Sequence, residues 1–474
     1  MNQSIVMKYF KELSAIPRAS FNEKAASDYV VAFAKERNLK YIQDAMNNVI
    51  VFKDATPGYE NVPTLMLQSH LDMVAEKNKD SDHNFDTDPI ELIEKDGWLF
   101  ANKTTLGADD GVGVVYMLAI LDELENHPAL ECVFTVEEET GLTGADFIDL
   151  SMLESTLCIG LDGSGESETY ISSSGGVRGL ITKDLTYDKQ ESASVKIAIR
   201  GLLGGHSGGE IDKERGNANK IAGIILRRAL KEQDIRLVSI DGGLKVNAIP
   251  RESDFEISVS DTASFLTWFE GIEKELKTQF EFSDSGLNFI TQVSSVDQVL
   301  SKEDSDAIIN LLAFLPYGMI QRSFAIEDLV ITSANIGTVD IVDGQLKIQV
   351  SLRATQSFVI ENLMDQVQYL SESLGFSISY SSKYPGWNYD VNSKFRPHLL
   401  KVYKELRKSD MDVVATHGGL ELGIWKDKLP NLDIVSFGPI MEDIHTPDER
   451  LNIASFNSTY EFLKTLVSSL NELN

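Results

Sequence analysis

Apolar and polar positions follow two different patterns along this chain. Through residues 1–186 and again through 388–474, short apolar runs of strand length alternate with longer segments of helical character. The run at 130–136 is mostly apolar, for example, whereas 112–121 stays apolar over the length of a helix. Strands that alternate with helices in this way are typical of a layered α/β domain.

Residues 187–387 follow the second pattern. The segment 193–200 alternates apolar and polar side chains, which predicts a half-exposed strand. Residues 255–264 align with 346–355, and an apolar helix is expected after each of them. A strand-then-helix repeat indicates an inserted domain of two related α+β lobes, although chance alignment of amphipathic segments would produce the same pattern.

The α/β pattern returns after the insertion, with a helix expected at 398–407 and a strand at 432–437. We therefore predict a discontinuous α/β domain, residues 1–186 and 388–474, and an inserted domain, residues 187–387. A chain of 474 residues is long enough for two or three domains. At the start of the chain, a short amphipathic helix is expected to end near Pro17, and Ser20 with Glu23 has the spacing of a capping box that opens a second helix.

Charge and cysteine content narrow the class of protein. The formal net charge is −30, which argues against nucleic acid or an anionic membrane as a partner. No apolar run approaches the roughly 20 residues of a membrane span, and the first 20 residues lack the apolar core of a signal peptide. Cys132 and Cys158 both lie in apolar runs, as expected for buried free thiols in a reducing compartment. We expect a cytoplasmic protein.

Candidate chemistry lies where the apolar runs end. The run that begins at residue 64 leads to His70 and Asp72, whose side chains would face the same way at a strand end. A carboxylate beside an imidazole is the usual arrangement for orienting a metal-binding nitrogen. Taken alone, the pair fits a hydrogen-bonded surface pair better than a metal site.

Four further segments place acids or a histidine at the end of an apolar run or beside one. They carry, in order, Asp109 with Asp110, the acids Glu137 to Glu139, Asp162, and His445. Ligands of open α/β sheets bind outside the carboxyl ends of the strands. Five such segments therefore predict one site at that edge of the sheet.

A mixed set of imidazoles and carboxylates suits a pair of divalent metal ions. Two ions about 3.5–4 Å apart can activate a water and polarise a carbonyl, as amide hydrolysis requires. Histidine with carboxylate favours zinc, manganese or cobalt, whereas magnesium favours oxygen ligands. The inventory allows one bridging carboxylate and leaves a glutamate free as general base.

The motifs resemble those of the M20 family of dinuclear metallopeptidases, and most closely its aminoacyl-histidine dipeptidase (Xaa-His dipeptidase) branch. The matching motifs are SHLDMV (69–74), LGADDGVG (106–113), EETGLTGA (138–145), GLDG (160–163), GGHSGGEI (204–211), VNAIPRE (246–252), HGGLELG (417–423) and IHTPDE (444–449). They occur in the family's order and span nearly the whole chain.

The resemblance implies an α/β fold in which a mixed-sheet dinuclear metallopeptidase catalytic domain carries an inserted two-lobed α+β lid domain. It implies metal-dependent hydrolysis of dipeptides, either Xaa-His or a broader range, by a cytoplasmic enzyme. Two divalent ions per chain would be zinc, with cobalt or manganese as alternatives. The partner would be a small peptide substrate, and the resemblance leaves a homodimer through the lid open.

The resemblance also assigns roles residue by residue. Asp109 would bridge the two metals, and the remaining ligands would be His70 and Asp162 on one metal, Glu139 and His445 on the other. Glu138 would be the general base, because the family pattern Glu-Glu-x-Gly selects Glu138 and Glu139 over Glu137. Asp72 would orient His70. Asp110 receives no metal role, and Glu137 is expected to be a structural or surface acid.

In the lid, His206 would stabilise the developing oxyanion over the scissile carbonyl. Asn247 and Arg353 are candidates for holding the substrate carboxylate, with a hydrogen bond or surface ion pair as the alternative. His417 and Glu421 would lie near the mouth of the site, and Glu421 would hold the substrate amine. The histidines outside the motifs, at 83, 127 and 398, are expected at the surface.

Two other functions are compatible with parts of the sequence. Residues 205–209 match the Gly-x-Ser-x-Gly elbow of serine hydrolases, which requires a buried strand before it and a helix directly after it. A non-catalytic peptide-binding protein would be indicated by the loss of a ligand or of the base, and none is missing here. The segment GADDGVG lacks the lysine of a nucleotide-binding loop.

Overall fold

The structure is a computed structural model of the whole chain and describes residues 4–324, 326 and 329–473. The chain forms two compact units. Unit 1 comprises Met1–Ser172, Trp387–Ala415 and Glu421–Asn474, and unit 2 comprises Ser173–Gly386 and Thr416–Leu420.

Unit 1 is built around an eight-stranded mixed sheet. Its strands lie in the order β1 (Lys40–Gln43), β2 (Val49–Lys53), β6 (Leu130–Thr135), β3 (Leu65–His70), β7 (Leu157–Gly160), β21 (Asp433–Ser436), β8 (Glu168–Tyr170) and β20 (Asp412–Val414). The central strands β6, β3, β7 and β21 run parallel to one another, whereas β1 and β2 are antiparallel additions. Parallel central strands place several carboxyl ends at one edge, where ligands bind in such folds.

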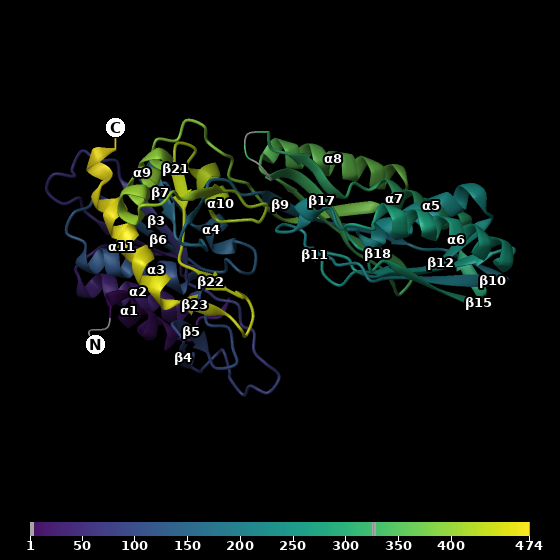
Figure 1. Cartoon of the computed structure of the whole chain (residues 1–474), viewed down its shortest axis with the longest axis horizontal. Coiled ribbons are helices and arrows are strands. Elements are labelled where there is room, and N and C mark those ends of the chain that lie inside the picture. The colour runs from purple at the N-terminus through teal and green to yellow at the C-terminus, as the bar shows by residue number, and fades with distance from the viewer. Residues whose placement is uncertain (1–3, 325, 327–328, 474) are drawn as a thin grey trace. The chain divides into compact units, whose positions relative to one another are not determined.

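Helices cover this sheet (Figure 1). They are α1 (Ile5–Ser14), α2 (Lys24–Glu36), α3 (Ala108–Glu123), α4 (Thr143–Phe147), α9 (Phe395–Arg407), α10 (Leu422–Lys428), α11 (Ile453–Ser468) and the 3₁₀ helix η2 (Leu470–Glu472). A small sheet of β22 (Met441–Glu442), β23 (Arg450–Asn452), β5 (Trp98–Ala101) and β4 (Leu92–Lys95) completes the unit.

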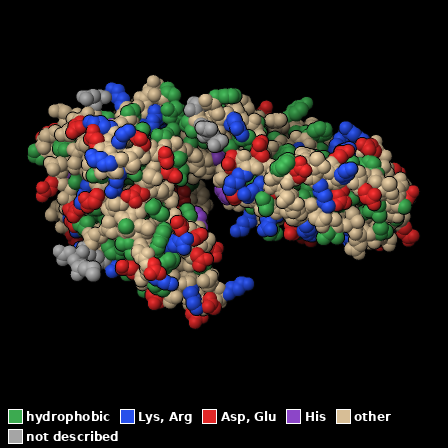
Figure 2. Space-filling view, in the orientation of Figure 1, with side chains coloured by type: hydrophobic (Ala, Val, Ile, Leu, Met, Phe, Trp, Pro, Cys, Tyr) green, Lys and Arg blue, Asp and Glu red, His purple; other side chains and the backbone are tan. Residues whose placement is uncertain are grey.

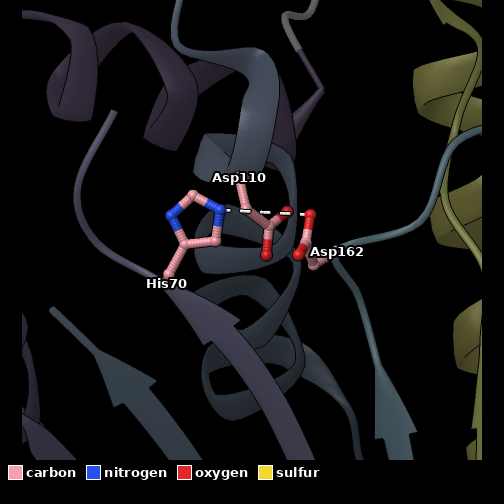
Figure 3. A group of neighbouring side chains, drawn as sticks. All are labelled: His70, Asp110 and Asp162. Atoms are coloured by element: carbon pink, nitrogen blue, oxygen red, sulfur yellow. Dashed lines mark ion pairs between the residues drawn. The ribbon is translucent and has the colours of Figure 1, made fainter. Parts of the chain in front are cut away.

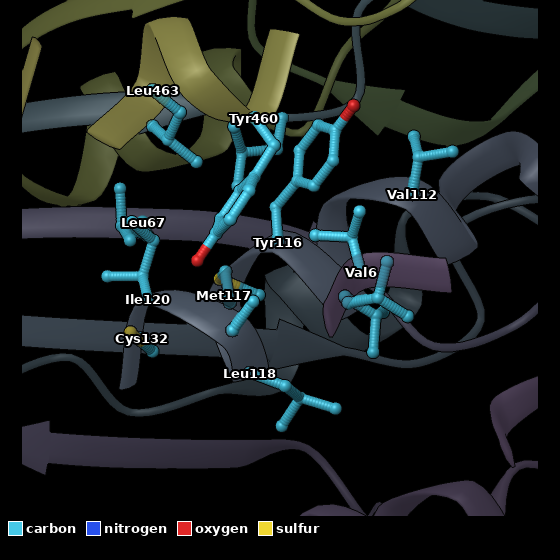
Figure 4. Packing of buried hydrophobic residues seen from close by; sticks show 14 of the residues in the cluster. Val6, Leu67, Val112, Tyr116, Met117, Leu118, Ile120, Cys132, Tyr460 and Leu463 are labelled. Atoms are coloured by element: carbon cyan, nitrogen blue, oxygen red, sulfur yellow. The ribbon is translucent and has the colours of Figure 1, made fainter. Parts of the chain in front are cut away.

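Helix α3 lies at the centre of the unit 1 core. Residues 111–121 carry no charged side chain, and every residue from Ala108 to Leu121 is buried. A helix that is apolar all round must be enclosed by other elements. Figure 4 shows Val6 of α1 and Tyr460 of α11 among the side chains around it, and the rings of Tyr116 and Tyr460 stack with centroids 5.7 Å apart. Asp109, near the start of this helix, is therefore attached to a rigidly packed element.

Unit 2 contains a nine-stranded antiparallel sheet. Eight strands lie in the order β15 (Asn288–Leu300), β10 (Tyr187–Arg200), β14 (Ser253–Val259), β12 (Ile235–Gly242), β17 (Val330–Val342), β18 (Gln345–Ala354), β9 (Gly175–Asp184) and β19 (Ser377–Tyr384), and β16 (Gly318–Arg322) pairs with β17. A short pair, β11 (Gly205–His206) with β13 (Ala248–Ile249), stands apart from this sheet.

The helices of unit 2 pack on the apolar face of its sheet, and they are α5 (Ala218–Glu232), α6 (Thr262–Gln279), α7 (Lys302–Phe314), α8 (Ser357–Ser373) and the 3₁₀ helix η1 (Ile211–Lys213). The repeat seen in the sequence corresponds to β14 followed by α6 and β18 followed by α8. In each copy a strand leads directly into a helix, and α8 packs on β18 whereas α6 packs on β10 and β15.

Two local predictions are wrong. Ser20 does not cap α2, which begins at Lys24, because the Ser20 hydroxyl donates instead to Asp72 at 2.8 Å. His127 and His398 are buried, at 0% and 7% exposure, and not at the surface. Each imidazole has one polar neighbour, since His127 Nδ1 lies 2.7 Å from the Pro128 carbonyl and His398 Nε2 lies 2.8 Å from the Ser469 hydroxyl. Nε2 of His127 is buried and has no partner among the described residues.

Cys132 and Cys158 are buried free thiols, as predicted. The surface mixes charges of both signs, and on the visible face acidic side chains are spread over both units (Figure 2). Among the described residues, no helix combines the length and the apolar character needed to span a bilayer.

Candidate metal centre

Three parallel strands bring the predicted site residues to one edge of the unit 1 sheet. Strand β3 ends at His70, β6 is followed by Glu137 to Glu139, and β7 is followed by Asp162. Because β3 pairs in parallel with both β6 and β7, the three carboxyl ends are neighbours. The apolar runs that build the sheet thus determine where the polar side chains meet.

Asp109 lies between the two predicted histidine ligands. Its Oδ1 is 3.0 Å from His70 Nε2, and its Oδ2 is 3.0 Å from His445 Nε2. The two histidines are 375 residues apart in sequence, yet they contact opposite oxygens of one carboxylate. That arrangement is the one expected of a carboxylate that bridges two metal ions.

The remaining acids complete two groups around this pair. Glu139 Oε2 is 3.1 Å from His445 Nε2, and Asp162 Oδ1 is 3.9 Å from His70 Nε2. Ligand atoms of His70, Asp109 and Glu139 lie within 4.8 Å of one another, and so do those of His70, Asp110 and Asp162. Figure 3 shows the second group, with Asp110 and Asp162 beside the His70 ring.

Asp110 is therefore closer to the candidate site than the sequence predicted. It is fully buried, and its Oδ1 accepts a hydrogen bond from the Gly113 amide, while its Oδ2 has no partner among the described residues. The family pattern gave Asp110 no metal role, but its carboxylate lies close enough to His70 and Asp162, within 4.8 Å, for the three side chains to bind one metal ion.

Asp72 connects the imidazole to the glutamate turn. Its Oδ1 is 3.4 Å from His70 Nδ1 and accepts from the Glu138 amide at 3.0 Å, while its Oδ2 accepts from the Glu139 amide at 3.2 Å. Asp72 is 0% exposed, so these contacts are shielded from water. One side chain thereby orients a candidate ligand and the backbone of the candidate base.

The site is rich in negative charge. Burial raises the pKa of Glu138 well above its usual value, and the neighbouring Glu139 adds to the rise. Burial and the Asp109 carboxylate raise the pKa of Asp162 in the same way. Hydrogen bonds to Asp109 and Glu139 raise the pKa of His445 to about 10. Without metal ions, protons on the imidazoles and carboxyls balance this charge, and divalent cations would displace them.

The side chains fit divalent metal ions on chemical grounds. Glu139 Oε1 and Asp110 Oδ2 are buried and have no hydrogen-bond partner among the described residues. Buried carboxylate oxygens without a donor are unfavourable unless a cation binds them. The donors combine imidazole nitrogen with carboxylate oxygen, which zinc, cobalt and manganese accept.

The candidates that the sequence analysis assigned to the inserted domain lie in unit 2. Nδ1 of His206 accepts hydrogen bonds from the amides of Gly208 and Gly209, at 3.2 and 3.0 Å. The Asn247 carbonyl accepts from the Ser207 amide at 2.9 Å, next to His206. Arg353 is 8% exposed, and its Nη1 donates to the Tyr384 hydroxyl at 3.1 Å and lies 3.4 Å from the His417 carbonyl.

Two of the predicted substrate-binding residues are more enclosed than expected. His417 is 6% exposed, its Nε2 lies 2.7 Å from the Ser333 hydroxyl, and burial lowers its pKa to about 3. Glu421 belongs to unit 1, is 2% exposed and accepts from Gln68 at 2.5 Å and Thr135 at 2.7 Å. Both hydrogen bonds use Oε2, and Oε1 is buried with no partner among the described residues, so the amine contact of Glu421 stays a prediction.

The structure also places at the site two residues that received no role in the sequence analysis. Arg18 and Glu449 are buried and both bind the backbone of the turn before Asp109. Glu449 lies within the IHTPDE motif, which was a signal for it, whereas Arg18 had none.

Comparison with known proteins decides the family. The sequence profile of peptidase family M20/M25/M40 matches residues 66–469. The chain is 33% identical over 469 residues to the cytosol non-specific dipeptidase of Escherichia coli (strain K12), covering 97% of this chain and 96% of that protein. The chain belongs to peptidase family M20/M25/M40.

Solved structures agree with the assignment to the M20 family. The crystal structure of aminoacylhistidine dipeptidase from Vibrio alginolyticus matches with a TM-score of 0.91 at 32% identity, covering 99% of this chain and 97% of that one. Aminopeptidase PepT from Bacillus cereus, at 15% identity and a TM-score of 0.57, shares the fold alone, over 99% of each chain. The predicted family, the mixed α/β fold and the prediction of a peptide hydrolase are confirmed. Membership of the M20 family also implies that the chain binds divalent metal.

The serine hydrolase alternative is not favoured. Ser207 follows the two-residue strand β11 and is itself followed by a turn and the three-residue η1, so the strand–helix elbow that such a nucleophile needs is not formed there. The Ser207 hydroxyl is buried and has no hydrogen-bond partner among the described residues, which leaves it without a base.

Proposed function

We propose that this M20 family peptidase hydrolyses dipeptides with free termini, including those with a carboxy-terminal histidine, at a centre of two divalent metal ions. The observation that carries the proposal is the Asp109 carboxylate, which has one oxygen 3.0 Å from His70 and the other 3.0 Å from His445. The names of the two similar proteins, a non-specific dipeptidase and an aminoacylhistidine dipeptidase, support the choice of substrate. The name of the first also supports a cytoplasmic location.

Five side chains of unit 1 would hold the metals. Asp109 would be shared, and the other four would be His70 and Asp162 for one ion, Glu139 and His445 for the other. When bound, two such ions, which we propose to be zinc with cobalt or manganese as substitutes, activate a water and polarise the scissile carbonyl. The Asp110 carboxylate would offset part of the positive charge of the metal ion held by His70 and Asp162.

Glu138 would move the proton in the reaction. Its turn is fixed by the hydrogen bond from its amide to Asp72, and its carboxyl is next to Glu139 without being one of the five proposed ligands, so it is free to accept a proton. Glu138 would take a proton from the attacking water as the oxygen–carbon bond forms. It would then give the proton to the amine nitrogen as the carbon–nitrogen bond breaks.

Unit 2 would act as the lid, with His206 as a hydrogen-bond donor to the developing oxyanion. Because Nδ1 of His206 accepts from two backbone amides, Nδ1 carries no proton, and the ring proton must be on Nε2. A neutral imidazole in this tautomer can donate a hydrogen bond without being an acid.

Arg353 would bind the free carboxylate of the substrate. The described contacts of its guanidinium are with a hydroxyl and a carbonyl, and its buried Nε has no partner among the described residues. A buried guanidinium in such surroundings has donors left for a planar anion. A Cβ at Gly208 would lie 3.2 Å from Arg353 Cζ, so the His206 turn is adjacent, and Asn247 and His417 would complete the wall of this subsite.

The experiment is a panel of dipeptides, with and without carboxy-terminal histidine, tested on chelator-stripped protein reloaded with one kind of metal at a time. We expect activity to return with zinc, cobalt or manganese, and to fall when the dipeptide is amino-acetylated or carboxy-amidated. Hydrolysis that persists after complete metal removal, and that a serine-reactive phosphonate abolishes, would refute the proposal.

A further inference from the structure

The turn that carries Asp109 is attached to the His70 strand by a buried arginine. Arg18, in the segment between α1 and α2, is 3% exposed. Its Nη1 donates to the carbonyls of Leu71 at 2.8 Å and Asp72 at 3.0 Å, and its Nη2 donates to the carbonyl of Gly107. One guanidinium therefore joins the residues after His70 to the residues before Asp109.

The same turn is attached to the His445 loop by a buried glutamate. Glu449, four residues after His445, is 2% exposed. Its Oε2 accepts from the amides of Leu106 at 2.7 Å and Gly107 at 3.1 Å. Its Oε1 accepts from the amides of Ala108 at 2.8 Å and Asp109 at 3.4 Å.

Local structure accounts for both attachments. Asp109 and Asp110 have non-helical backbone angles, so the amides of residues 106–109 precede the regular part of α3. These buried amides need an acceptor from outside the helix, and the Glu449 carboxylate supplies it. Gly107 has φ +69°, which favours glycine, and a Cβ there would lie only 2.6 Å from Arg18 Nη2. At Gly111 a Cβ would lie 2.7 Å from the same atom, so both glycines make room for the guanidinium.

We propose that Arg18 and Glu449 are positioning residues that hold the Asp109 carboxylate between the His70 and His445 imidazoles before any metal binds. The inference rests on the proposed metal centre. Arg18 fixes the distance from the Asp109 turn to the His70 strand, and Glu449 fixes its distance to the His445 loop. If either attachment is lost, the three donor groups no longer form one preorganised set, and the affinity for metal falls.

Zinc affinity, measured by competition with a coloured chelator on the full chain, tests the proposal. Arg18→Lys keeps the charge, but a single ammonium cannot reach all three carbonyls, and Glu449→Gln keeps the shape but replaces an acceptor oxygen with a donor. We expect each variant to bind zinc about tenfold or more weakly, the usual cost of losing an outer partner of a metal ligand. The visible spectrum of the cobalt-loaded variants should also differ from that of the parent chain.

Two matched controls separate positioning from general stability. Lys53→Met removes donors to the Leu121 and Leu124 carbonyls at the other end of α3, about 20 Å along the helix axis from the turn. Glu131→Gln alters a buried carboxylate that accepts from the amides of Glu154 and Ser155. Both controls should lower the melting temperature yet keep the zinc affinity and the cobalt spectrum of the parent chain.

The outcomes also distinguish this inference from the proposed function. Suppose that the parent chain binds zinc tightly and that circular dichroism shows both Arg18→Lys and Glu449→Gln to be folded. If these variants then bind zinc as tightly as the parent and give the same cobalt spectrum, the positioning role is refuted and the metal centre stands. Equal losses in the controls would refute it too. A parent chain that binds no divalent metal would instead refute the proposed function.

Discussion

A single side chain, Asp72, is bonded to several parts of the proposed machinery. It contacts His70 Nδ1 and accepts from the amides of Glu138 and Glu139. The carboxylate of a His-x-Asp pair is expected to set the tautomer of its histidine. Here it also fixes the backbone of the turn that carries the proposed base and one proposed ligand. The direction of the Glu138 side chain thus depends on the strand that carries His70.

Replacing Glu138 tests whether it acts as the general base and is not itself a metal ligand. Glu138→Ala should retain both metals, because the five proposed ligands are untouched, and should lose about 10²–10⁴-fold in kcat, the usual contribution of proton transfer. Metal analysis and steady-state kinetics on the same preparation check the two expectations. Glu137→Gln is the matched control on the same turn and should keep full activity. Near-normal turnover in Glu138→Ala would contradict the assignment.

Replacing His206 tests its proposed role as a neutral hydrogen-bond donor to the oxyanion. His206→Ala should lower kcat by about 10²–10³-fold with a much smaller change in KM, because an oxyanion donor acts mainly in the transition state. Since its Nδ1 is occupied by two amides, His206→Gln, which can also donate, should recover part of the loss. A change confined to KM would indicate a role in substrate binding instead.

At the scale of elements, strand ends were predictable from the sequence and side-chain attachments to the backbone were not. The parallel pairing of β3 with β6 and β7 follows from apolar runs, and it alone brings His70, Glu139 and Asp162 together. Arg18 left no trace in the sequence because its partners are carbonyls, which every residue possesses. The Ser20 cap failed for a related reason, since a tertiary contact with Asp72 replaced the local one.

The acid Asp304, in the first turn of α7, makes the stability of unit 2 depend on pH. Asp304, at the start of α7, is buried, and hydrogen bonds from Thr186, Lys183 and Ser301 outweigh that burial and lower its pKa to about 2 from its usual 3.8. Because the folded pKa is depressed, the contribution is present above pH 3.8 and is lost as the pH falls through 2.

Asp304→Asn should therefore cost about 2 kcal/mol in the free energy of unfolding at pH 7, and the gap from the parent chain should shrink as the pH falls from 4 towards 2. Urea unfolding at several pH values measures it. Asp306→Asn is the control, since the contact of this half-exposed acid within the described part of the chain is an i,i+4 pair with Lys302, worth about 0.3–0.5 kcal/mol. A gap that does not change with pH would contradict the explanation.

At the scale of the whole molecule, all five proposed ligands belong to unit 1. A ligand that binds only the folded state stabilises it by RT ln(1 + [L]/Kd), about 4 kcal/mol at a thousandfold excess over Kd. We therefore expect zinc to raise the melting temperature of unit 1, and a chelator to lower it, with little change in unit 2. Calorimetry with intrinsic fluorescence checks this, and an equal shift of both transitions would show that the units unfold together.

The five-residue stretch Thr416–Leu420 is assigned to unit 2, although the chain on both sides of it belongs to unit 1. Residues 173–386 are consequently not a self-contained cassette. A chimera that grafts those residues alone from a related peptidase would pair a foreign Ser333 and Arg353 with the native His417, whose ring and carbonyl they contact. Exchange of substrate preference between relatives should succeed only when this short stretch is transplanted together with the larger block.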